Sequence, residues 1–316
     1  MADDLWTLDD AHLDRALAAV AHNAIRTPLV PAPAFGTRVF LKLETEQHTG
    51  SFKVRGALAK LASLDEERRR LPVVAASAGN HGLGVAYAAR ILGLAARVHV
   101  PEGTPLVKRN GMAALGATVV VTPEPGYDAA ERAARADAQQ TGGTFVSPFD
   151  DPHVAAGNGG TLGLEILGAM ASLSAVVAPV GGGGLMAGLG AARSRAGKST
   201  RLIGVQSHAC PAMARSLEQG APILEMRGEP TLAEGLEGGV SASTFALVRD
   251  AVERIDLVSE EEIAAAMTTA RDRMGLVTEG SAATVLAWAI KHLGAEPGTD
   301  PVVLVVTGRN VELRPA

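Results

Sequence analysis

Cysteine, lysine and long apolar runs are scarce in this 316-residue chain, and each scarcity excludes something. One cysteine, Cys210, rules out an intramolecular disulfide and a zinc site built from cysteines. No apolar run reaches membrane-spanning length without a Gly, a Pro or a charge. The acidic first ten residues have neither the basic nor the apolar region of a secretory signal. We therefore expect a reducing, cytoplasmic setting.

The charge balance gives no sign of a polyanionic partner. With 29 Lys and Arg against 34 Asp and Glu the net charge is −5, so we expect no binding to nucleic acid or to a membrane surface. The hydrophobic share of 47% and the charged share of 20% are typical of a globular protein. The length leaves room for two α/β domains.

Apolar runs alternate with Ala-rich helical patterns, which predicts an α/β fold with parallel sheets wound by right-handed crossovers. The expected strands are Val39–Leu43, Val73–Ala76, Arg97–Val100, Thr118–Val121, Ala175–Pro179, Leu202–Gln206 and Val302–Thr307. The expected helices are Phe52–Ser63, His81–Leu92, Leu106–Leu115, Tyr127–Gln140, Ala156–Met170, Leu185–Ala196 and Glu260–Met274.

The alternation also suggests a division into domains. We expect residues 72–148 to form a small α/β domain with four strand–helix repeats, and residues 1–71 and 149–316 to form a larger domain. The region Gly228–Ser243, rich in Gly, Glu and Pro, is expected to be loop.

The chain has only six lysines, and one of them, Lys53, opens an expected helix. The segment around it is Thr49-Gly50-Ser51-Phe52-Lys53-Val54-Arg55-Gly56-Ala57. A lysine at a helix start feels the positive end of the helix dipole, which disfavours the charged amine. A neutral amine serves as a nucleophile and as a base. The alternative is a surface lysine on an amphipathic helix.

Two further segments follow expected strands and open expected helices, where open α/β sheets bind ligands. Ser77-Ala78-Gly79-Asn80-His81-Gly82 offers backbone N–H groups, a hydroxyl and an amide to a carboxylate, or else Ser77 or Asn80 simply caps a helix. The run Gly181-Gly182-Gly183-Gly184-Leu185 suits N–H groups placed around a phosphate. A tight strand–helix connection is the alternative, which the length of the run disfavours.

A fourth segment, Thr307-Gly308-Arg309-Asn310, ends the last expected strand and taken alone would be a turn. In this order the four segments resemble one family, the fold-type II pyridoxal-phosphate enzymes of the serine/threonine dehydratase and serine racemase group. The resemblance runs from Arg26-Thr27-Pro28-Leu29 through Lys42-Leu43-Glu44 to the last strand, and it includes SFKVRGA, SAGNHG, PFDDP, GGGGL and AEGLEGG. It implies two open, twisted parallel-sheet domains like those of the tryptophan synthase β-subunit. It also implies pyridoxal 5′-phosphate as cofactor and a homodimer or higher homo-oligomer.

The resemblance also implies a role for each matching residue. Lys53 would be joined covalently to the cofactor and would move protons at the substrate's α-carbon. The residues that would bind the cofactor are Phe52 along its ring, Asn80 at its 3′-oxygen, Gly181, Gly182, Gly183 and Gly184 at its phosphate, Gly235 near the ring, Glu279, and Thr307 at the pyridine nitrogen. The residues that would bind the substrate carboxylate are Ser77, Ala78, Gly79, Asn80 and His81. For Glu279 a plain helix-start carboxylate is an equally good interpretation.

Three departures from the family pattern carry expectations of their own. Ala78 stands where serine racemases have their second proton donor, so we expect dehydration and no racemisation. Gln206 and Ala212 replace carboxylates that bind a divalent cation in relatives, so we expect no metal there. Arg309 replaces a glycine, resembles a subgroup that acts in hydroxyectoine breakdown, and would meet a second carboxylate or fill a turn.

The expected function is α,β-elimination from a small β-hydroxy amino acid, L-threonine or L-serine, which gives a 2-oxo acid and ammonia. Alternatives are a dehydratase for hydroxyaspartate or a hydroxyectoine-pathway substrate, a serine racemase, and β-replacement as in cysteine synthases. Val54-Arg55-Gly56-Ala57 after the lysine favours the dehydratase. A non-catalytic cofactor-binding protein is a further alternative. Because the sequence stops soon after the last expected strand, we expect no regulatory module and no feedback by isoleucine.

Overall fold

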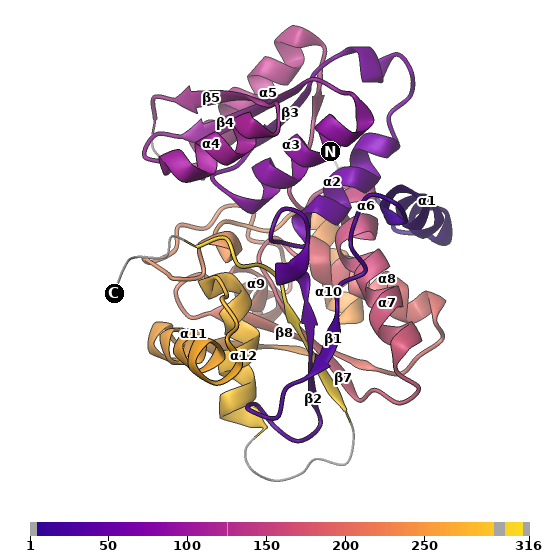
Figure 1. Cartoon of the computed structure of the whole chain (residues 1–316), viewed down its shortest axis with the longest axis vertical. Coiled ribbons are helices and arrows are strands. Elements are labelled where there is room, and N and C mark those ends of the chain that lie inside the picture. Colours follow the sequence, from indigo (N-terminus) through magenta and orange to yellow (C-terminus); the bar gives the residue numbers. More distant parts are fainter. Residues whose placement is uncertain (1–4, 125, 294–300, 312–316) are drawn as a thin grey trace.

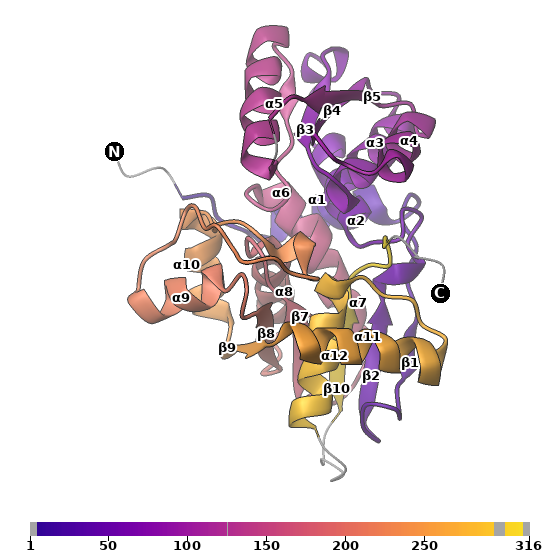
Figure 2. The ribbon, with the colours of Figure 1, turned by 90° about the vertical axis from the view of Figure 1, so that its left-hand side faces the viewer.

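Two sheets organise the molecule. The structure is a computed structural model that describes residues 5–124, 126–293 and 301–311. The larger sheet has the strand order β1-β2-β10-β7-β8-β9 and the smaller one β5-β4-β3-β6. They lie in two lobes, the smaller sheet in the upper one in Figures 1 and 2. All strand pairs are parallel except β1 with β2, so the expected parallel-sheet fold is confirmed, with one antiparallel strand at the edge of the larger sheet.

The smaller sheet and its helices come from one continuous stretch of chain. Its elements are β3 Val73–Ala76, α3 Asn80–Leu92, β4 Ala96–Pro101, α4 Leu106–Ala114, β5 Thr118–Thr122, α5 Tyr127–Thr141 and β6 Thr144–Phe145. Helices α3 and α4 cover one face of this sheet and α5 covers the other (Figure 2). Four strands alternate with three helices here, so the expected fourth strand–helix repeat is incomplete.

The larger sheet takes its elements from both sides of that stretch. The elements before it are α1 Asp10–Val20, β1 Leu29–Pro31, β2 Val39–Leu43, α2 Lys53–Ala62 and two 3₁₀ turns, Glu44–Glu46 and Arg68–Arg70. The elements after it are α6 Pro152–Ala155, a π-helix Ala156–Thr161, α7 Leu162–Ala169, β7 Ala175–Pro179, α8 Gly184–Arg195, β8 Arg201–Ser207, α9 Ala212–Gln219, a 3₁₀ turn Glu234–Leu236, α10 Ala242–Ala251, β9 Arg254–Val258, α11 Glu260–Met274, α12 Gly280–His292 and β10 Val302–Val306.

The sequence located most of the elements that carry the fold. All seven expected strands are present with ends within one residue, and so are six of the seven expected helices. The helix expected at Ala156–Met170 is instead a composite of α6, the π-helix and α7. The expected loop Gly228–Ser243 contains a 3₁₀ turn and the first residues of α10. The structure also contains elements that the sequence patterns do not predict. These are strands β1, β6 and β9 and helices α1, α9, α10 and α12.

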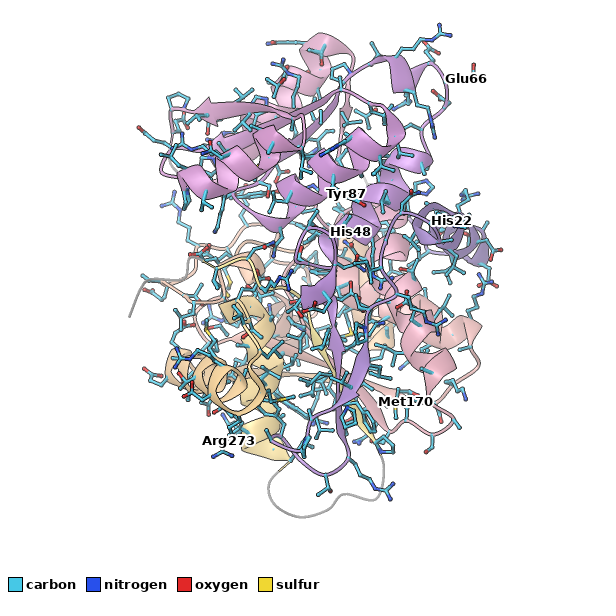
Figure 3. The ribbon with its side chains drawn as sticks, in the orientation of Figure 1. His22, His48, Glu66, Tyr87, Met170 and Arg273 are labelled. Atoms are coloured by element: carbon cyan, nitrogen blue, oxygen red, sulfur yellow. The ribbon has the colours of Figure 1, made fainter. Side chains whose placement is uncertain are left out.

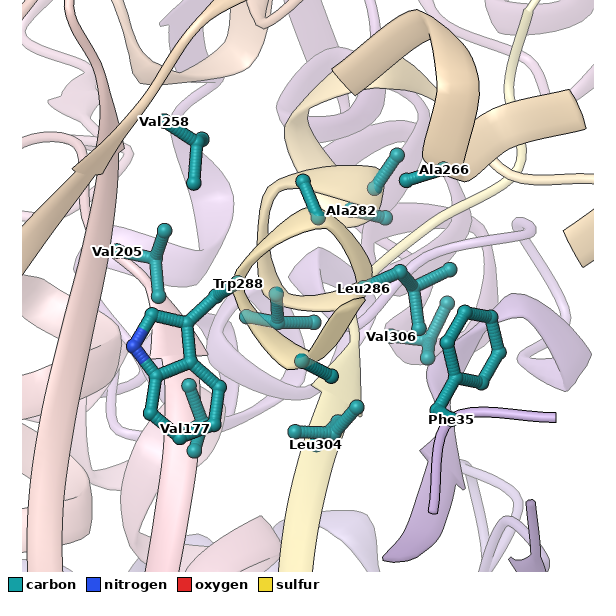
Figure 4. Close-up of a cluster of buried hydrophobic side chains, with 14 of the residues drawn as sticks. Phe35, Val177, Val205, Val258, Ala266, Ala282, Leu286, Trp288, Leu304 and Val306 are labelled. Atoms are coloured by element: carbon teal, nitrogen blue, oxygen red, sulfur yellow. The ribbon is translucent and has the colours of Figure 1, made fainter. Parts of the chain in front are cut away.

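Helix α12 crosses the larger sheet and forms the centre of its core. Trp288 packs over the sheet beside Val177, Val205 and Leu304 (Figure 4). The indole Nε1 donates to Asp256 at 2.7 Å, so its polar atom is satisfied although its rings are buried.

A second core cluster belongs to the smaller sheet. It contains Leu58 of α2 together with Val73 and Ala75 of β3, so α2 packs against the smaller lobe. We keep the division at residues 72 and 148 as a proposal.

Beneath α2 lies a buried network of four charged side chains. The guanidinium of Arg55 donates to both carboxylate oxygens of Glu44, at 2.8 and 2.9 Å, and to Glu165 at 2.7 Å. Lys42 donates to Glu165 at 2.6 Å and to the carbonyl of Thr27 at 2.7 Å. The two positive and two negative charges compensate one another. Burial nevertheless lowers the pKa of Lys42, because the hydrogen bond and charge of Glu165 offset only part of the desolvation. The network joins β2, α2 and α7 at the base of the helix that begins with Lys53.

We expect Arg55→Met to lower the free energy of unfolding by about 3–5 kcal/mol, because it removes the charged partner of the fully buried Glu44 carboxylate and leaves it the hydroxyl of Thr27 as a donor. Arg132, whose partner Glu124 is as exposed as itself, is the matched control, and Arg132→Met should change stability by less than about 1 kcal/mol. Denaturant unfolding followed by circular dichroism measures both. Equal, small losses in the two variants would contradict a stabilising role for the network.

Candidate active site

Lys53 begins α2 and lies against the end of β10. The N–H of Phe52 donates to the carbonyl of Thr307 at 3.0 Å, and Ser51 forms an antiparallel bridge with Gly308. The Lys53 ammonium donates to the carbonyl of Pro148 at 2.9 Å and lies 5.1 Å from the centre of the Phe52 ring. Two segments that are about 250 residues apart in the sequence are therefore joined, as their expected common role requires.

The surroundings of Lys53 lower the pKa of its amine. Burial lowers the pKa of the Lys53 amine to about 8, and the carboxylate of Glu279 opposes this shift. Its position as the first residue of a helix acts in the same direction as burial. The alternative of a surface lysine is therefore wrong, because this amine is desolvated and near neutral pH a useful fraction of it is uncharged.

The glycine run forms the connection from β7 to α8. Within the described residues, the N–H groups of Gly181, Gly182, Gly183 and Gly184 donate to no acceptor in the protein. Gly183 has a φ of +93°, a conformation that favours glycine. The four N–H groups at a helix start offer the donors and the partial positive charge that a phosphate needs.

Close packing also requires glycine at positions 182 to 184. A Cβ on Gly182 would lie 2.5 Å from the ring of Phe149, and a Cβ on Gly184 would lie 2.7 Å from the Phe149 carbonyl. A Cβ on Gly183 would lie 2.6 Å from the methyl group of Met213. The tight connection and the anion loop are therefore compatible, because the glycines let the loop pack closely while their N–H groups stay free.

The lysine helix and the glycine loop are held together by the π-helix between α6 and α7. Asn158 accepts from the N–H of Gly56 at 2.8 Å, and a Cβ on Gly56 would lie 2.6 Å from the Asn158 amide. On the other side, a Cβ on Gly159 would lie 2.0 Å from the carbonyl of Leu185 in α8. Backbones that approach this closely fix the position of Lys53 relative to the glycine loop.

The turn after β3 presents free N–H groups. Helix α3 begins at Asn80 with Gly79 as its N-cap residue, so neither Ser77 nor Asn80 is the cap, and the Ser77 hydroxyl accepts from the N–H of Gly79 at 3.0 Å. The N–H groups of Ala78, Asn80 and His81 have no acceptor within the described part of the chain. They form a second anion site of the kind expected for a carboxylate.

His81 contributes no positive charge to that turn. Its Nε2 lies 2.9 Å from the carbonyl of Val146, which can only accept, so Nε2 carries the proton. Burial, reinforced by the charge of Lys53, lowers the pKa of His81 to about 3. The imidazole is neutral, and backbone N–H groups rather than an imidazolium would bind a carboxylate here.

Asn80 is held by two residues of the other lobe. Its Nδ2 lies 2.8 and 2.9 Å from the two carboxylate oxygens of Glu279, and its Oδ1 accepts from Asn310 at 2.7 Å. Burial raises the pKa of Glu279, while the hydrogen bonds from Asn80 and the backbone of Asn310, with the charges of Lys108 and Lys53, oppose that shift. Glu279 is the N-cap residue of α12, yet its side chain makes no capping bond. The helix-start interpretation therefore does not account for its carboxylate. The contact of Asn310 with Asn80 joins residues 230 apart, and no sequence motif indicates it.

The remaining residues singled out from the sequence have contacts of their own within the chain. Gly235 donates its N–H to the Ser281 hydroxyl at 2.9 Å. The half-exposed Arg309 guanidinium lies 3.2 Å from Glu46, so Arg309 has a carboxylate partner within the chain itself. Gln206 is buried and accepts from the N–H of Ala214 at 2.8 Å. Within residues 5–124, 126–293 and 301–311 no group of three or more His, Cys, Asp and Glu side chains could hold a metal ion, and the expected lack of a metal at Gln206 stays a prediction.

A pair of stacked rings lies where the two lobes meet. His48 and Tyr87 carry rings that stack with centres 5.1 Å apart, and Figure 3 shows both where the lobes meet. His48 precedes the lysine segment and Tyr87 belongs to α3. The stack, like the hydrogen bonds of Asn80, holds α3 beside that segment.

In the described ranges no helix is both long and apolar enough to cross a membrane.

The two α/β lobes thus bring together an amine at a helix start and two strand–helix turns whose backbone N–H groups have no acceptor among the described residues. The model of the family described as pyridoxal-phosphate dependent enzyme matches residues 20–308, and this chain belongs to that family. The expected family and fold are confirmed, and pyridoxal phosphate is the cofactor of the family.

Several characterised proteins are similar to this chain over nearly its whole length. The L-threonine ammonia-lyase of Thermotoga maritima is 40% identical over 97% of this chain and 76% of its own length. The catabolic L-threonine dehydratase of Staphylococcus aureus is 36% identical over 99% of this chain and 94% of its own length. Among solved structures, a processed threonine deaminase of Solanum lycopersicum matches with a TM-score of 0.89 at 31% identity, over 96% of this chain and 90% of the other.

The residues present fit the cofactor. The N–H groups of Gly181 to Gly184 suit its phosphate, because they lie at a helix start and have no acceptor among the described residues. The lowered pKa of the Lys53 amine suits attack on its aldehyde, and the amide of Asn80 suits its ring oxygen.

Proposed function

We propose that this protein eliminates the β-hydroxyl of L-threonine and L-serine and releases the 2-oxo acid and ammonia. One observation supports the proposal: the buried Lys53 amine donates to the carbonyl of Pro148, whose neighbour Phe149 packs on the glycine run, and its charge acts on His81 of the turn after β3. The names of the relatives at 36–40% identity support the choice of threonine. In the overall reaction the hydroxyl leaves as water, and one water is taken up when ammonia is released.

When bound, pyridoxal phosphate supplies an aldehyde that joins amines covalently and a ring that draws electrons from the α-carbon. Lys53 would hold the aldehyde between turnovers, and its neutral amine would take the α-proton of the substrate. Phe52 and Gly235 would flank the ring. The N–H groups of Ala78, Asn80 and His81 would hold the substrate carboxylate and so direct the α-hydrogen toward Lys53.

Two residues would direct the chemistry toward elimination. Thr307 would offer the pyridine nitrogen a neutral hydroxyl, which stabilises a protonated ring less than an aspartate does and so favours prompt loss of the β-hydroxyl. Ala78 has no proton to donate on the second face of the substrate, so we expect no racemisation.

A panel of β-hydroxy amino acids tests the proposal. Purified protein with the cofactor should release ammonia and 2-oxobutanoate from L-threonine, and ammonia and pyruvate from L-serine, while chiral chromatography shows no D-serine. If hydroxyaspartate reacts and neither L-threonine nor L-serine does, the substrate assignment is wrong. Cysteine formed from an activated serine and sulfide would favour β-replacement instead.

The pKa of Lys53 predicts how cofactor uptake depends on pH. Only the neutral amine attacks the aldehyde, and burial lowers its pKa to about 8, so the uptake rate should rise with pH and level off above about 8. Stopped-flow absorbance with the cofactor-free protein measures the rate, and N-acetyl-lysine amide in solution is the control. A midpoint near 10.5, the value of an ordinary lysine, would contradict the desolvated site.

We further propose a homodimer or larger homo-oligomer in a reducing, cytoplasmic setting. The resemblance to dehydratases supports the assembly, and the single cysteine, Cys210, which is buried, supports the setting. Sedimentation of the purified protein tests the assembly, because a monomer at working concentration would contradict it.

A further inference from the structure

Asn310, the last residue of the Thr307–Asn310 segment, has no role in the proposed function. Its Nδ2 donates to the carbonyl of Thr49 and to Oδ1 of Asn80, both at 2.7 Å. Thr49 lies four residues before Lys53, and Asn80 begins α3 in the other lobe. One amide therefore joins the end of β10, the lysine segment and the turn that would bind the substrate.

The contacts of Asn80 fix which way its amide faces. A side-chain amide has nearly the same shape when turned by half a rotation, so neighbours decide its orientation. Here Oδ1 accepts from the NH₂ group of Asn310, which only donates, and Nδ2 faces the Glu279 carboxylate, which when ionised only accepts. Rotating the amide would oppose donor to donor and acceptor to acceptor. The two neighbours thus allow a single orientation.

The surrounding backbone is shaped around these two neighbours. A Cβ on Gly308 would lie 2.5 Å from Oε1 of Glu279, and a Cβ on Gly50 would lie 2.6 Å from Oδ1 of Asn310. Gly50 has a φ of +70°, and the N–H of Glu279 donates to the carbonyl of Gly308 at 3.1 Å. Both side chains are therefore confined to the places from which they reach Asn80.

We propose that Asn310 and Glu279 are positioning residues that hold the Asn80 amide with an N–H directed at the 3′-oxygen of the cofactor. The inference rests on the proposed function, since it assumes that Asn80 meets that oxygen. Nδ2 has two N–H groups, so one can pass to the ring oxygen while the other stays with Glu279. The orientation then sets how tightly the ring is held and how much negative charge its oxygen carries, which the visible absorption of the bound cofactor reports.

The first test replaces Asn310 by an isostere that cannot donate. Asn310→Asp places a carboxylate against Oδ1 of Asn80, so the affinity for pyridoxal phosphate should fall about tenfold to a hundredfold. The visible band of the bound cofactor should move in wavelength or in its pH midpoint. Arg309→Ala is the matched control in the same segment, because that side chain meets Glu46, and it should leave both measurements unchanged.

A double variant separates positioning from stability. Asn80→Asp with Glu279→Gln keeps the total charge and restores every hydrogen bond, because the aspartate at 80 accepts from Asn310 and from the glutamine at 279. We expect the cofactor-free double variant to melt near the parent temperature but to bind the cofactor as weakly as Asn310→Asp. Parent-like affinity and spectrum in this variant would overturn the inference.

The measurements distinguish a failure of the positioning role from a failure of the proposed function. If the parent takes up cofactor, turns over threonine and shows its visible band while Asn310→Asp matches it in every measurement, the positioning role is wrong and the proposed function stands. If the parent itself neither binds the cofactor nor turns over threonine, the proposed function is wrong and the inference falls with it.

Discussion

Lys53→Ala should lower the rate of ammonia release from L-threonine by at least about a thousandfold, since one side chain supplies both the covalent attachment and the base. The amine is suited to both because burial lowers its pKa to about 8. Release of 2-oxobutanoate, followed with lactate dehydrogenase and NADH, measures the loss. The variant should still bind the cofactor without a covalent bond, because the glycine loop is untouched.

Lys198→Ala is the control, because Lys198 is an exposed lysine outside the candidate site. It should turn over threonine at the parent rate. If Lys53→Ala kept most of the parent activity, another group would be the base, and the catalytic assignment would be lost. If the parent bound cofactor but turned over no amino acid, the protein would be a non-catalytic cofactor-binding protein.

Gly182→Ala should weaken the binding of pyridoxal phosphate by about a hundredfold or more. The new Cβ would lie 2.5 Å from the Phe149 ring, so either the ring or the loop must move. A displaced loop misaligns the N–H groups of Gly181 to Gly184, and each lost hydrogen bond to a charged group costs about 1.5–3 kcal/mol. Fluorescence titration of the cofactor-free protein measures the affinity.

Two comparisons make this result specific to the phosphate. Gly168→Ala, on the exposed face of α7 with no atom within 4 Å of the new Cβ, should leave the affinity unchanged and the melting temperature equal or slightly higher. Pyridoxal, which has no phosphate, should bind equally to Gly182→Ala and to the parent. If Gly182→Ala bound pyridoxal phosphate as tightly as the parent does, the glycine run would be explained by packing alone.

The site residues that can be predicted from the sequence lie between a strand and the helix that follows it. Lys53 and the glycine run are such cases, because unusual residues at a junction of this kind point to a ligand. The contact of Asn310 with Asn80 was out of reach, since it joins residues 230 apart and depends on how the two lobes meet. The same holds for the buried charges of Arg55, Glu44 and Lys42, which a sequence cannot distinguish from surface charges.

Several of the unexpected elements lack the periodicity from which a helix or strand is predicted. Helix α12 is buried on every side from Gly280 to Ala289, so it shows no alternation between an apolar and a polar face. Strands β1 and β6 have only three and two residues, and β9 is a half-exposed edge strand. The π-helix follows from close approach of Gly157 and Gly159 to neighbouring backbones, which no periodicity reveals.

The covalent link itself can be located directly. Protein saturated with pyridoxal phosphate is reduced with borohydride, digested and analysed by mass spectrometry. The account predicts that the added mass lies on the peptide containing Lys53 and on no other lysine. Reduced cofactor on a different lysine, or protein that stays colourless and unmodified with cofactor in excess, would contradict it.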